Sequence, residues 1–222
     1  MCGRFNLFAN KQELIERFQL VNGVDFDLSE RYNIAPSQDV FTVVKGKDGN
    51  RGGFLRWGLI PSWANDAKIG YKMINARAET VDKKPSFKNL LLRRRCFIIA
   101  NGFYEWKKIG DEKQPYHMRQ KNKEPFAFAG LWDRWENNGQ MIQSCTMITT
   151  EPNKLVQPIH DRMPVILTKE AERIWLDPSV EDPVQLKRLL VPFPSAKMEA
   201  YPISSAVNSP RQDFKGIIDK LD

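Results

Sequence analysis

The sequence predicts an α+β fold with a mainly antiparallel β core, barrel-like or built as two packed sheets, and short helices flanking it. From residue 95 onward, segments of strand character follow one another closely. Polar turns such as KNKE and ENNG join several of them, and short turns connect antiparallel neighbours. Helical patterns are short and few. Because the 222 residues contain no repeat, low-complexity tract or linker, we expect one domain over 1–222.

The first half is expected to begin with a helix and continue with a hairpin. In KQELIERFQL (11–20) the apolar residues form one helical stripe, and Asn10 is suited to cap its start. DVFTVVKG (39–46) and GGFLRW (52–57) flank KDGN, which predicts two paired strands. The loop WGLIPSWAND follows, and a short helix is expected over about 86–92.

The second half is expected to supply most strands. RCFIIANGFYEWKK predicts one long strand bent at Asn101–Gly102. Shorter strands are expected over 115–120, 125–135, 140–151 and 165–168. KEAERIWL is amphipathic and predicts a helix, as does the segment around 184–190, and KMEAYPISSAV (197–207) is expected to close the sheet.

Composition favours a soluble cytoplasmic protein with an anionic partner. The net charge of +7 makes nucleic acid the first candidate. The cationic clusters Arg93–Arg95 and Lys83–Lys84 fit a phosphate track and a solvated surface equally well. No apolar run is long enough for a membrane helix, and no signal peptide precedes KQELIERF.

Cysteine and histidine usage argues against a disulfide framework and a metal site. The three cysteines are odd in number and lack C-x-x-C spacing. Cys96 and Cys145 lie in strand-like segments, so buried, inert thiols are expected. His117 and His160 are the only histidines in the sequence, and we expect no metal or cofactor.

Cys2 has a chemistry that depends on its position. Once Met1 is removed, Cys2 carries a free α-amine and a thiol on adjacent carbons. The amine can condense with an aldehyde, and the thiol can then close a thiazolidine ring. An α-amine has a reference pKa of about 7.7–8.0, so part of it is neutral and nucleophilic at pH 7. Considered without the other motifs, Cys2 is equally well explained as a cysteine that occurs at the second position by chance.

Two further residues could transfer protons. Glu105 lies in the apolar strand segment NGFYEWKK, where burial would raise its pKa; an outward, solvated glutamate is the alternative. His160 lies between Pro158 and Pro164 in PIHDRMP. Its role there could be that of an acid–base group or of a structural loop residue. His117 falls within a strand, where packing is the expected role.

Other candidates could bind a substrate. INARAET places Asn75, Arg77 and Glu79 on one face if the segment is extended. Asn75 could then bond a substrate oxygen and Arg77 a phosphate, although an Arg77–Glu79 ion pair is equally compatible. The loops RYNIAPSQ and WGLIPSW, with Trp57 and Trp63, could pack structurally or form the wall of a cleft.

The ordered set MCGRF, RYNIAPSQ, WGLIPSW, INARAET, NGFYEW, HDRMPVIL and ISSAVNSP resembles the SOS response-associated peptidase (SRAP) family. The motifs run from residue 1 to about 210. The resemblance implies covalent capture of abasic sites in single-stranded DNA by Cys2, after autocatalytic or host removal of Met1. A Schiff base would form first and a thiazolidine second, protecting the lesion during the DNA damage response.

The resemblance also implies roles for individual residues. Glu105 matches the catalytic carboxylate, His160 the histidine that helps open the sugar, and Asn75 the residue that holds the reactants in register. The implied DNA-binding residues are Arg4, Arg77, Arg162, Trp57, Trp63 and Trp106. The implied partner is single-stranded DNA with abasic sites, and the protein would be nucleoid-associated if the source is bacterial. We expect a monomer, because nothing in the sequence demands a dimer, and no binding to a membrane.

Two other functions fit the same residues. One is a cysteine peptidase acting on proteins, with Cys2 as nucleophile, His160 as base and Glu105 as orienting acid. The other is a non-covalent reader of modified or damaged DNA. The requirement for an N-terminal amine distinguishes thiazolidine formation from the peptidase, whereas the reader would form only reversible, salt-sensitive complexes and no covalent species under denaturing conditions.

Overall fold

A computed structural model describes residues 2–22 and 26–221 of the chain. The strands are β1 (Phe5–Leu7), β2 (Arg31–Ile34), β3 (Asp39–Lys45), β4 (Asn50–Trp57), β5 (Asn75–Arg77), β6 (Arg95–Ala100), β7 (Gly102–Ile109), β8 (Glu112–Gln120), β9 (Phe126–Asn137), β10 (Gln140–Thr150), β11 (Met163–Pro164) and β12 (Met198–Pro202). The α-helices are α1 (Lys11–Phe18), α2 (Lys88–Arg93), α3 (Lys169–Trp175) and α4 (Pro183–Arg188). The 3₁₀ helices are η1 (Ala67–Lys72), η2 (Ser195–Lys197), η3 (Ser205–Asn208) and η4 (Lys215–Ile218).

Five strands close into a barrel in the order β10-β4-β3-β6-β9, because β9 also pairs with β10. All of these pairings are antiparallel except the parallel contact of β10 with β4. Strands β5 and β11 add to β10 beyond the closed ring. Closure leaves the ring strands without free edges over their paired lengths. The predicted α+β fold with a mainly antiparallel, barrel-like core is therefore confirmed.

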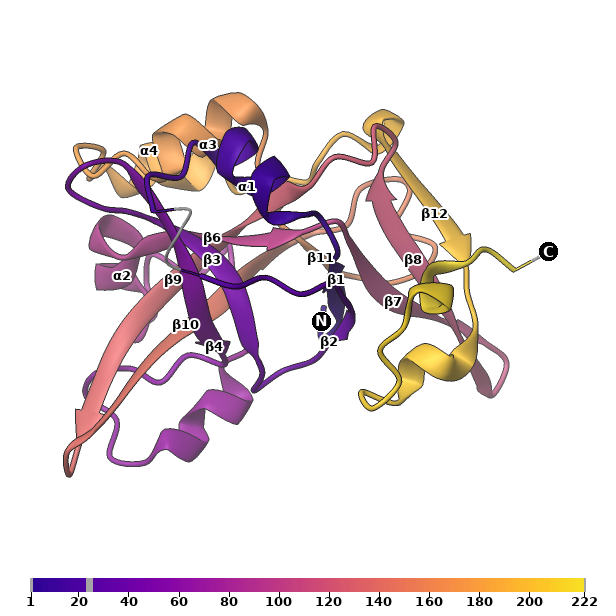
Figure 1. The fold of residues 1–222 in the computed structure, drawn as a ribbon, viewed down its shortest axis with the longest axis horizontal. Coiled ribbons are helices and arrows are strands. Elements are labelled where there is room, and N and C mark those ends of the chain that lie inside the picture. The colour runs from indigo at the N-terminus through magenta and orange to yellow at the C-terminus, as the bar shows by residue number, and fades with distance from the viewer. Residues whose placement is uncertain (1, 23–25, 222) are drawn as a thin grey trace.

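A second, antiparallel sheet has the order β12-β8-β7-β1-β2. In Figure 1, β7, β8 and β12 lie on one side of the molecule with the yellow C-terminal segment, and the barrel lies on the other. Strands β1 and β2 lie between them. This arrangement brings the start of the chain to the junction of the two sheets.

The predicted long strand through Asn101–Gly102 is two strands in different sheets, so that expectation was wrong. The Asn101 side chain accepts hydrogen bonds from the amides of Phe8 and Ala9, at 2.8 and 2.9 Å. These bonds fix the point where β6 ends in the barrel and β7 begins in the second sheet. A Cβ atom at residue 102 would lie 2.9 Å from the Met118 carbonyl oxygen, so glycine permits this close strand approach.

Other element boundaries differ from expectation. The segment expected to close the sheet is β12, an edge strand of the second sheet, whereas the pairing of β9 with β10 closes the barrel. Strand β12 ends at Pro202, and the Ser204 hydroxyl accepts from the Ala206 amide where η3 begins. Segment 165–168, which was expected to be a strand, forms a single bridge between Ile166 and Phe128, and the strand β11 lies just before it, at Met163–Pro164. Strands β1 and β2 were not predicted, because each is too short to show a period.

Two short helices pack over the barrel and are joined by an ion pair. The Asn10 side chain caps α1 as expected, and Leu14 and Phe18 are its buried residues. Arg17 on α1 donates two hydrogen bonds to Glu172 on α3, at 2.7 and 2.9 Å. Figure 1 shows α1, α3 and α4 on the same side of the barrel. Such a bidentate, largely buried pair fixes the relative position of the helices.

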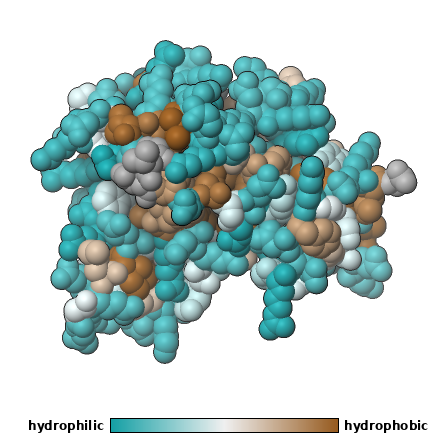
Figure 2. Space-filling model, viewed as in Figure 1, coloured by the Kyte–Doolittle hydropathy of each residue, from teal (hydrophilic) through white to brown (hydrophobic). Residues whose placement is uncertain are grey.

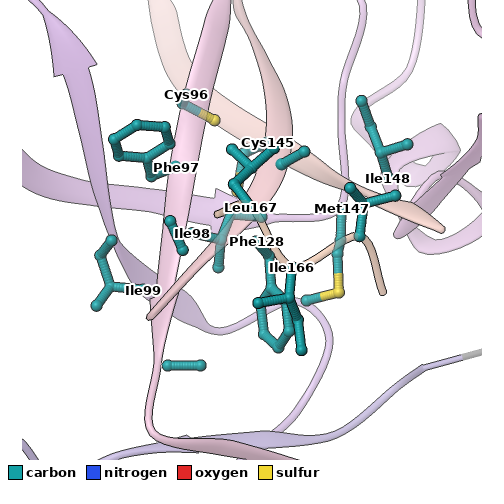
Figure 3. Close-up of a cluster of buried hydrophobic side chains, with 14 of the residues drawn as sticks. Cys96, Phe97, Ile98, Ile99, Phe128, Cys145, Met147, Ile148, Ile166 and Leu167 are labelled. Atoms are coloured by element: carbon teal, nitrogen blue, oxygen red, sulfur yellow. The ribbon is translucent and has the colours of Figure 1, made fainter. Parts of the chain in front are cut away.

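The barrel interior is filled by apolar side chains. In Figure 3, Cys96 and Ile98 point to the side of β6 where Phe128, Cys145 and Leu167 gather, whereas Phe97 and Ile99 point to the opposite side, where Phe97 meets Phe18 of helix α1. Each such side chain contributes roughly 1.5–3 kcal/mol when it leaves water completely. Both internal cysteines are completely buried, as expected, and burial raises the pKa of both thiols.

The outer surface is mostly hydrophilic on the face in Figure 2, with small separate hydrophobic areas. Among residues that the structure describes, no helix combines the length and apolar character needed to cross a bilayer.

Candidate functional site

Cys2 lies at the junction of the two sheets and is completely buried. The Asn75 side-chain amide donates to the Cys2 carbonyl oxygen at 2.8 Å, from strand β5. The Cys2 thiol points at the Arg4 carbonyl oxygen at 3.7 Å, and the Tyr104 amide bonds that same oxygen at 3.0 Å. The start of the chain is thus fixed by β5 on the barrel side and by β7 on the other.

The Cys2 thiol is held in its neutral form. Burial is the main cause that raises its pKa, and the negative charge of Glu105 raises it further. A thiolate nucleophile needs the opposite environment, with a nearby positive charge or a helix N-terminus. The site therefore does not favour direct thiolate attack.

Glu105 is a buried carboxyl group and only 2% exposed. Loss of hydration raises its pKa to about 8, and the charge of Asp161 adds to this shift. Its Oε1 atom makes no hydrogen bond to any residue that the structure describes. The solvated alternative is wrong, and this carboxyl can exchange a proton near neutral pH.

His160 lies beside Glu105, with 3.7 Å between its Nε2 atom and Oε2. The Arg162 amide donates to Nδ1 at 3.0 Å, and a carboxylate oxygen of Asp161 lies 3.1 Å from the same nitrogen. Partial burial lowers the pKa of the imidazole. Glu105 and His160, 55 positions apart in the sequence, thus lie side by side, and the charge of Glu105 acts on the Cys2 thiol.

A pocket of about 450 Å³ opens onto this pair. It is lined by Glu105, His160, Trp106, Lys113 and Asn208. Lys113 and Asn208 were not among the predicted site residues. Asn208 lies in the motif ISSAVNSP and could have been considered, whereas Lys113 reaches the pocket only through the β7–β8 pairing, opposite Lys108.

The three predicted phosphate-binding arginines differ in their surroundings. Arg77 is exposed at the end of β5. Arg162 makes a bidentate ion pair with Glu79, at 2.5 and 3.0 Å. Arg4 is half-buried, and its Nη1 atom donates to Asn33 Oδ1 at 2.7 Å. Phosphate contacts by these residues stay predictions, and Arg77 is the most accessible of the three.

The predicted tryptophans also differ. Trp57 is completely buried and donates through Nε1 to the Ile74 carbonyl oxygen at 2.9 Å, so the prediction that it contacts DNA is wrong. Its strand turns the ring into the core against Phe5. Trp63 is 59% exposed, and Trp106 lines the pocket with Nε1 bonded to Asn208 Oδ1 at 2.7 Å.

His117 has a packing role, as expected. It is completely buried, and burial lowers its pKa to about 3. Its ring bonds the Asn6 amide nitrogen at 2.9 Å and the Tyr201 hydroxyl at 2.8 Å. These bonds tie β1, β8 and β12 together inside the second sheet. In the described part of the chain, no three histidine, cysteine or acidic side chains gather as a metal site would require.

The elevated pKa of Glu105 gives a prediction on stability. Because this pKa lies near 8 in the folded protein and near 4.5 ordinarily, folding favours the protonated form. Wild-type stability should fall as pH rises between these values, because Glu105 ionises in the unfolded chain while the buried group stays protonated in the folded protein. Glu105→Gln has no such charge, so its stability relative to wild type should rise by a few kcal/mol between about pH 5 and about pH 9. Thermal unfolding at both pH values measures this, and a constant difference would contradict it.

Comparison with known proteins gives a consistent result. Residues 1–210 match the SOS response associated peptidase (SRAP) family. The chain is 49% identical to the abasic site processing protein YoqW of Bacillus subtilis strain 168, over 99% of both chains. It is 37% identical to the abasic site processing protein HMCES of Xenopus tropicalis, over 72% of this chain and 54% of that protein. A crystal structure of a Bacteroides thetaiotaomicron protein superposes with a TM-score of 0.88 at 30% identity, covering 99% of this chain and all of that one.

Proposed function

The chain belongs to the SRAP family, and we propose that it processes abasic sites in DNA by linking them covalently to Cys2. One observation carries this proposal: Cys2 is held by Asn75 beside an acid–base pair with a raised carboxyl pKa. An abasic deoxyribose opens to an aldehyde at C1′, which is the electrophile that a 1,2-aminothiol captures. The relatives' names point to the same substrate.

The reaction begins after hydrolysis of the Met1–Cys2 bond. The Cys2 α-amine attacks C1′ and gives a carbinolamine, which loses water to form a Schiff base. The thiol sulfur then adds to the imine carbon while its proton passes to the nitrogen, closing the thiazolidine. Overall, two bonds form at C1′ and one water molecule leaves. A neutral thiol suits this step, because its proton is needed on nitrogen.

Glu105 and His160 move the protons in this scheme. Glu105, with a pKa of about 8, accepts the proton of the amine and returns it to the departing hydroxyl. His160 exchanges a proton with the ring oxygen when the sugar opens. Asn75 holds the Cys2 main chain so that amine and aldehyde meet at a fixed distance. Glu105 also assists removal of Met1, unless a host aminopeptidase removes it.

We further propose that the lesion lies in single-stranded DNA, held by phosphate contacts and stacking. Arg77, Arg162 and Arg4 are the candidates for the phosphates, and Trp63 and Trp106 for the bases. Ring closure consumes the aldehyde, so strand cleavage by β-elimination is suppressed and the lesion is protected during the DNA damage response.

The test is the intact mass of the protein before and after incubation with single-stranded DNA that carries one abasic site. We expect loss of Met1 and a denaturation-resistant adduct that maps to Cys2. Reversible binding without an adduct would support a damage reader instead. Selective acylation of the α-amine should stop adduct formation; proteolysis of other proteins that survives this treatment would support a thiol peptidase.

Arg77→Ala tests the phosphate contacts. We expect weaker binding to abasic single-stranded DNA of any sequence, and a slope of log affinity against log salt that is smaller by about one. Binding titrations at several salt concentrations measure both quantities. Arg173→Ala, on helix α3 away from the pocket, is the matched control. An unchanged slope in Arg77→Ala would show that Arg77 does not contact a phosphate.

A further inference from the structure

We infer that Asn33 is a positioning residue that sets one wall of the pocket by holding the C-terminal arm, defined as residues 204–213. This inference rests on the proposed function for its kinetic consequence. Asn33 is on strand β2, outside the pocket lining, and it is completely buried. Its role follows from where its side-chain amide makes hydrogen bonds.

The two ends of the Asn33 side chain bind different parts of the molecule. Its Nδ2 atom donates to the carbonyl oxygens of Val207, Ser209 and Gln212, at 3.3, 2.9 and 2.6 Å. Its Oδ1 atom accepts from Arg4 Nη1 at 2.7 Å. The amide therefore joins three carbonyl groups of the arm to Arg4, the residue just before strand β1. No other residue type of this size offers both a donor pair and an acceptor.

Asp213 makes a second connection at the far end of the arm. Its Oδ1 atom accepts from the amides of Tyr32 and Asn33, at 2.5 and 3.1 Å, and its Oδ2 atom accepts from Arg31 Nε at 2.6 Å. Both connections end on β2. The apolar contact of this region is a small separate cluster that includes Val207 and Tyr201, so directed polar bonds define the position of the arm.

Asn208, the residue of the arm that lines the pocket, comes directly after Val207, whose carbonyl oxygen is hydrogen-bonded. Val207 accepts from Arg4 Nη1 at 2.6 Å, and Asn208 follows it. Asn208 then accepts from Trp106 Nε1, and both side chains line the pocket. A shift of the arm would move Asn208 and release the indole of Trp106.

The same hydrogen bonds reach the proposed nucleophile. Arg4 is two residues after Cys2, and the Arg4 carbonyl oxygen faces the Cys2 thiol. Asn33 thus connects the segment before β1, which contains the proposed nucleophile Cys2, to the arm that carries Asn208 of the pocket lining. Reactions between held groups depend steeply on such alignment.

The variant Asn33→Asp separates the two ends of this side chain. It keeps an oxygen for Arg4 and replaces the amide donor with an oxygen that faces three carbonyl groups. We expect the arm to move away from β2 while β1 stays in place. The rate of adduct formation at saturating abasic DNA should fall roughly ten- to a hundredfold, with a smaller change in the concentration for half-maximal rate.

Trp106 provides a readout that needs no DNA. Protein labelled with 5-fluorotryptophan gives one ¹⁹F resonance for each of the six tryptophans, and Trp106→Phe identifies the relevant one. We expect this resonance to shift in Asn33→Asp. Leu186→Ala, in the buried face of helix α4, is the control for lost stability and should change neither the Trp106 resonance nor the saturating rate.

An unchanged rate in Asn33→Asp, or a slower rate without a shifted Trp106 resonance, would overturn the inference. So would an equal loss of rate in Leu186→Ala. If Asn33→Asp does not fold, Asp213→Ala is the second variant, because it removes the hydrogen bonds that join the other end of the arm to β2. Asp213→Ala should slow the reaction in the same way, and a normal rate in this variant would overturn the inference. Failure of wild type to form any adduct would instead contradict the proposed function, while the resonance would still report the arm.

Discussion

Cys2→Ala is expected to abolish the denaturation-resistant complex with abasic single-stranded DNA and to leave reversible binding in place. The variant keeps an α-amine after Met1 removal and loses the sulfur that closes the ring. A Schiff base can still form, but it hydrolyses, because no second bond at C1′ replaces the imine. The thiol is completely buried in the free protein, so its removal changes little of the DNA-binding surface.

The measurement is a denaturing gel of protein mixed with abasic DNA, with and without borohydride. Borohydride should trap Cys2→Ala as a reduced amine adduct, whereas the untreated sample should show none. Cys96→Ala is the matched control, because that thiol is buried within the barrel and should not affect the adduct. A full yield of untreated adduct from Cys2→Ala would exclude thiazolidine formation.

Glu105→Gln is expected to lower the rate of adduct formation by about 10²–10⁴-fold at neutral pH. The amide has nearly the shape of the carboxyl group but cannot accept a proton. In wild type the rate should rise with pH through about 8, as Glu105 ionises. The Cys2 amine, with a reference pKa of about 7.7–8.0, adds a second rise in the same range. The variant should retain only the rise that belongs to the amine.

Single-turnover rates between about pH 6 and about pH 9 distinguish these profiles. Glu199→Gln is a suitable control, since that carboxylate pairs with Arg119 on the second sheet and lies outside the pocket lining. A Glu105→Gln profile as steep as that of wild type would mean that Glu105 does not act as the base.

Much of the fold could be predicted from local sequence. Asn10 before KQELIERF predicted helix α1, and KDGN between two strand patterns predicted the β3–β4 hairpin; both are confirmed. The failure at Asn101 has a specific cause. Its side chain bonds the amides of residues 8 and 9, far away in sequence, and these bonds separate two strands that look continuous.

The candidate site divides in the same way. The motifs around Cys2, Asn75, Glu105 and His160 named the residues, and the structure places these four together. The full lining of the pocket was not predictable, because Lys113 is contributed by strand β8 and Asn208 by the C-terminal arm. Trp57 shows the converse error: its loop-like neighbours suggested a cleft wall, but its strand turns the ring inward.

By itself, the sequence determined which residues carry reactive groups, where short helices begin and are capped, and where tight turns join strands. These properties depend on a residue and its immediate neighbours. Only the tertiary structure decided that the Glu105 carboxyl is buried, that the Cys2 thiol is neutral, and that Asn33 joins the arm to Arg4. Desolvation and directed hydrogen bonds depend on groups brought together from across the chain. Their effect on reactivity therefore exists only once the barrel and the second sheet have met.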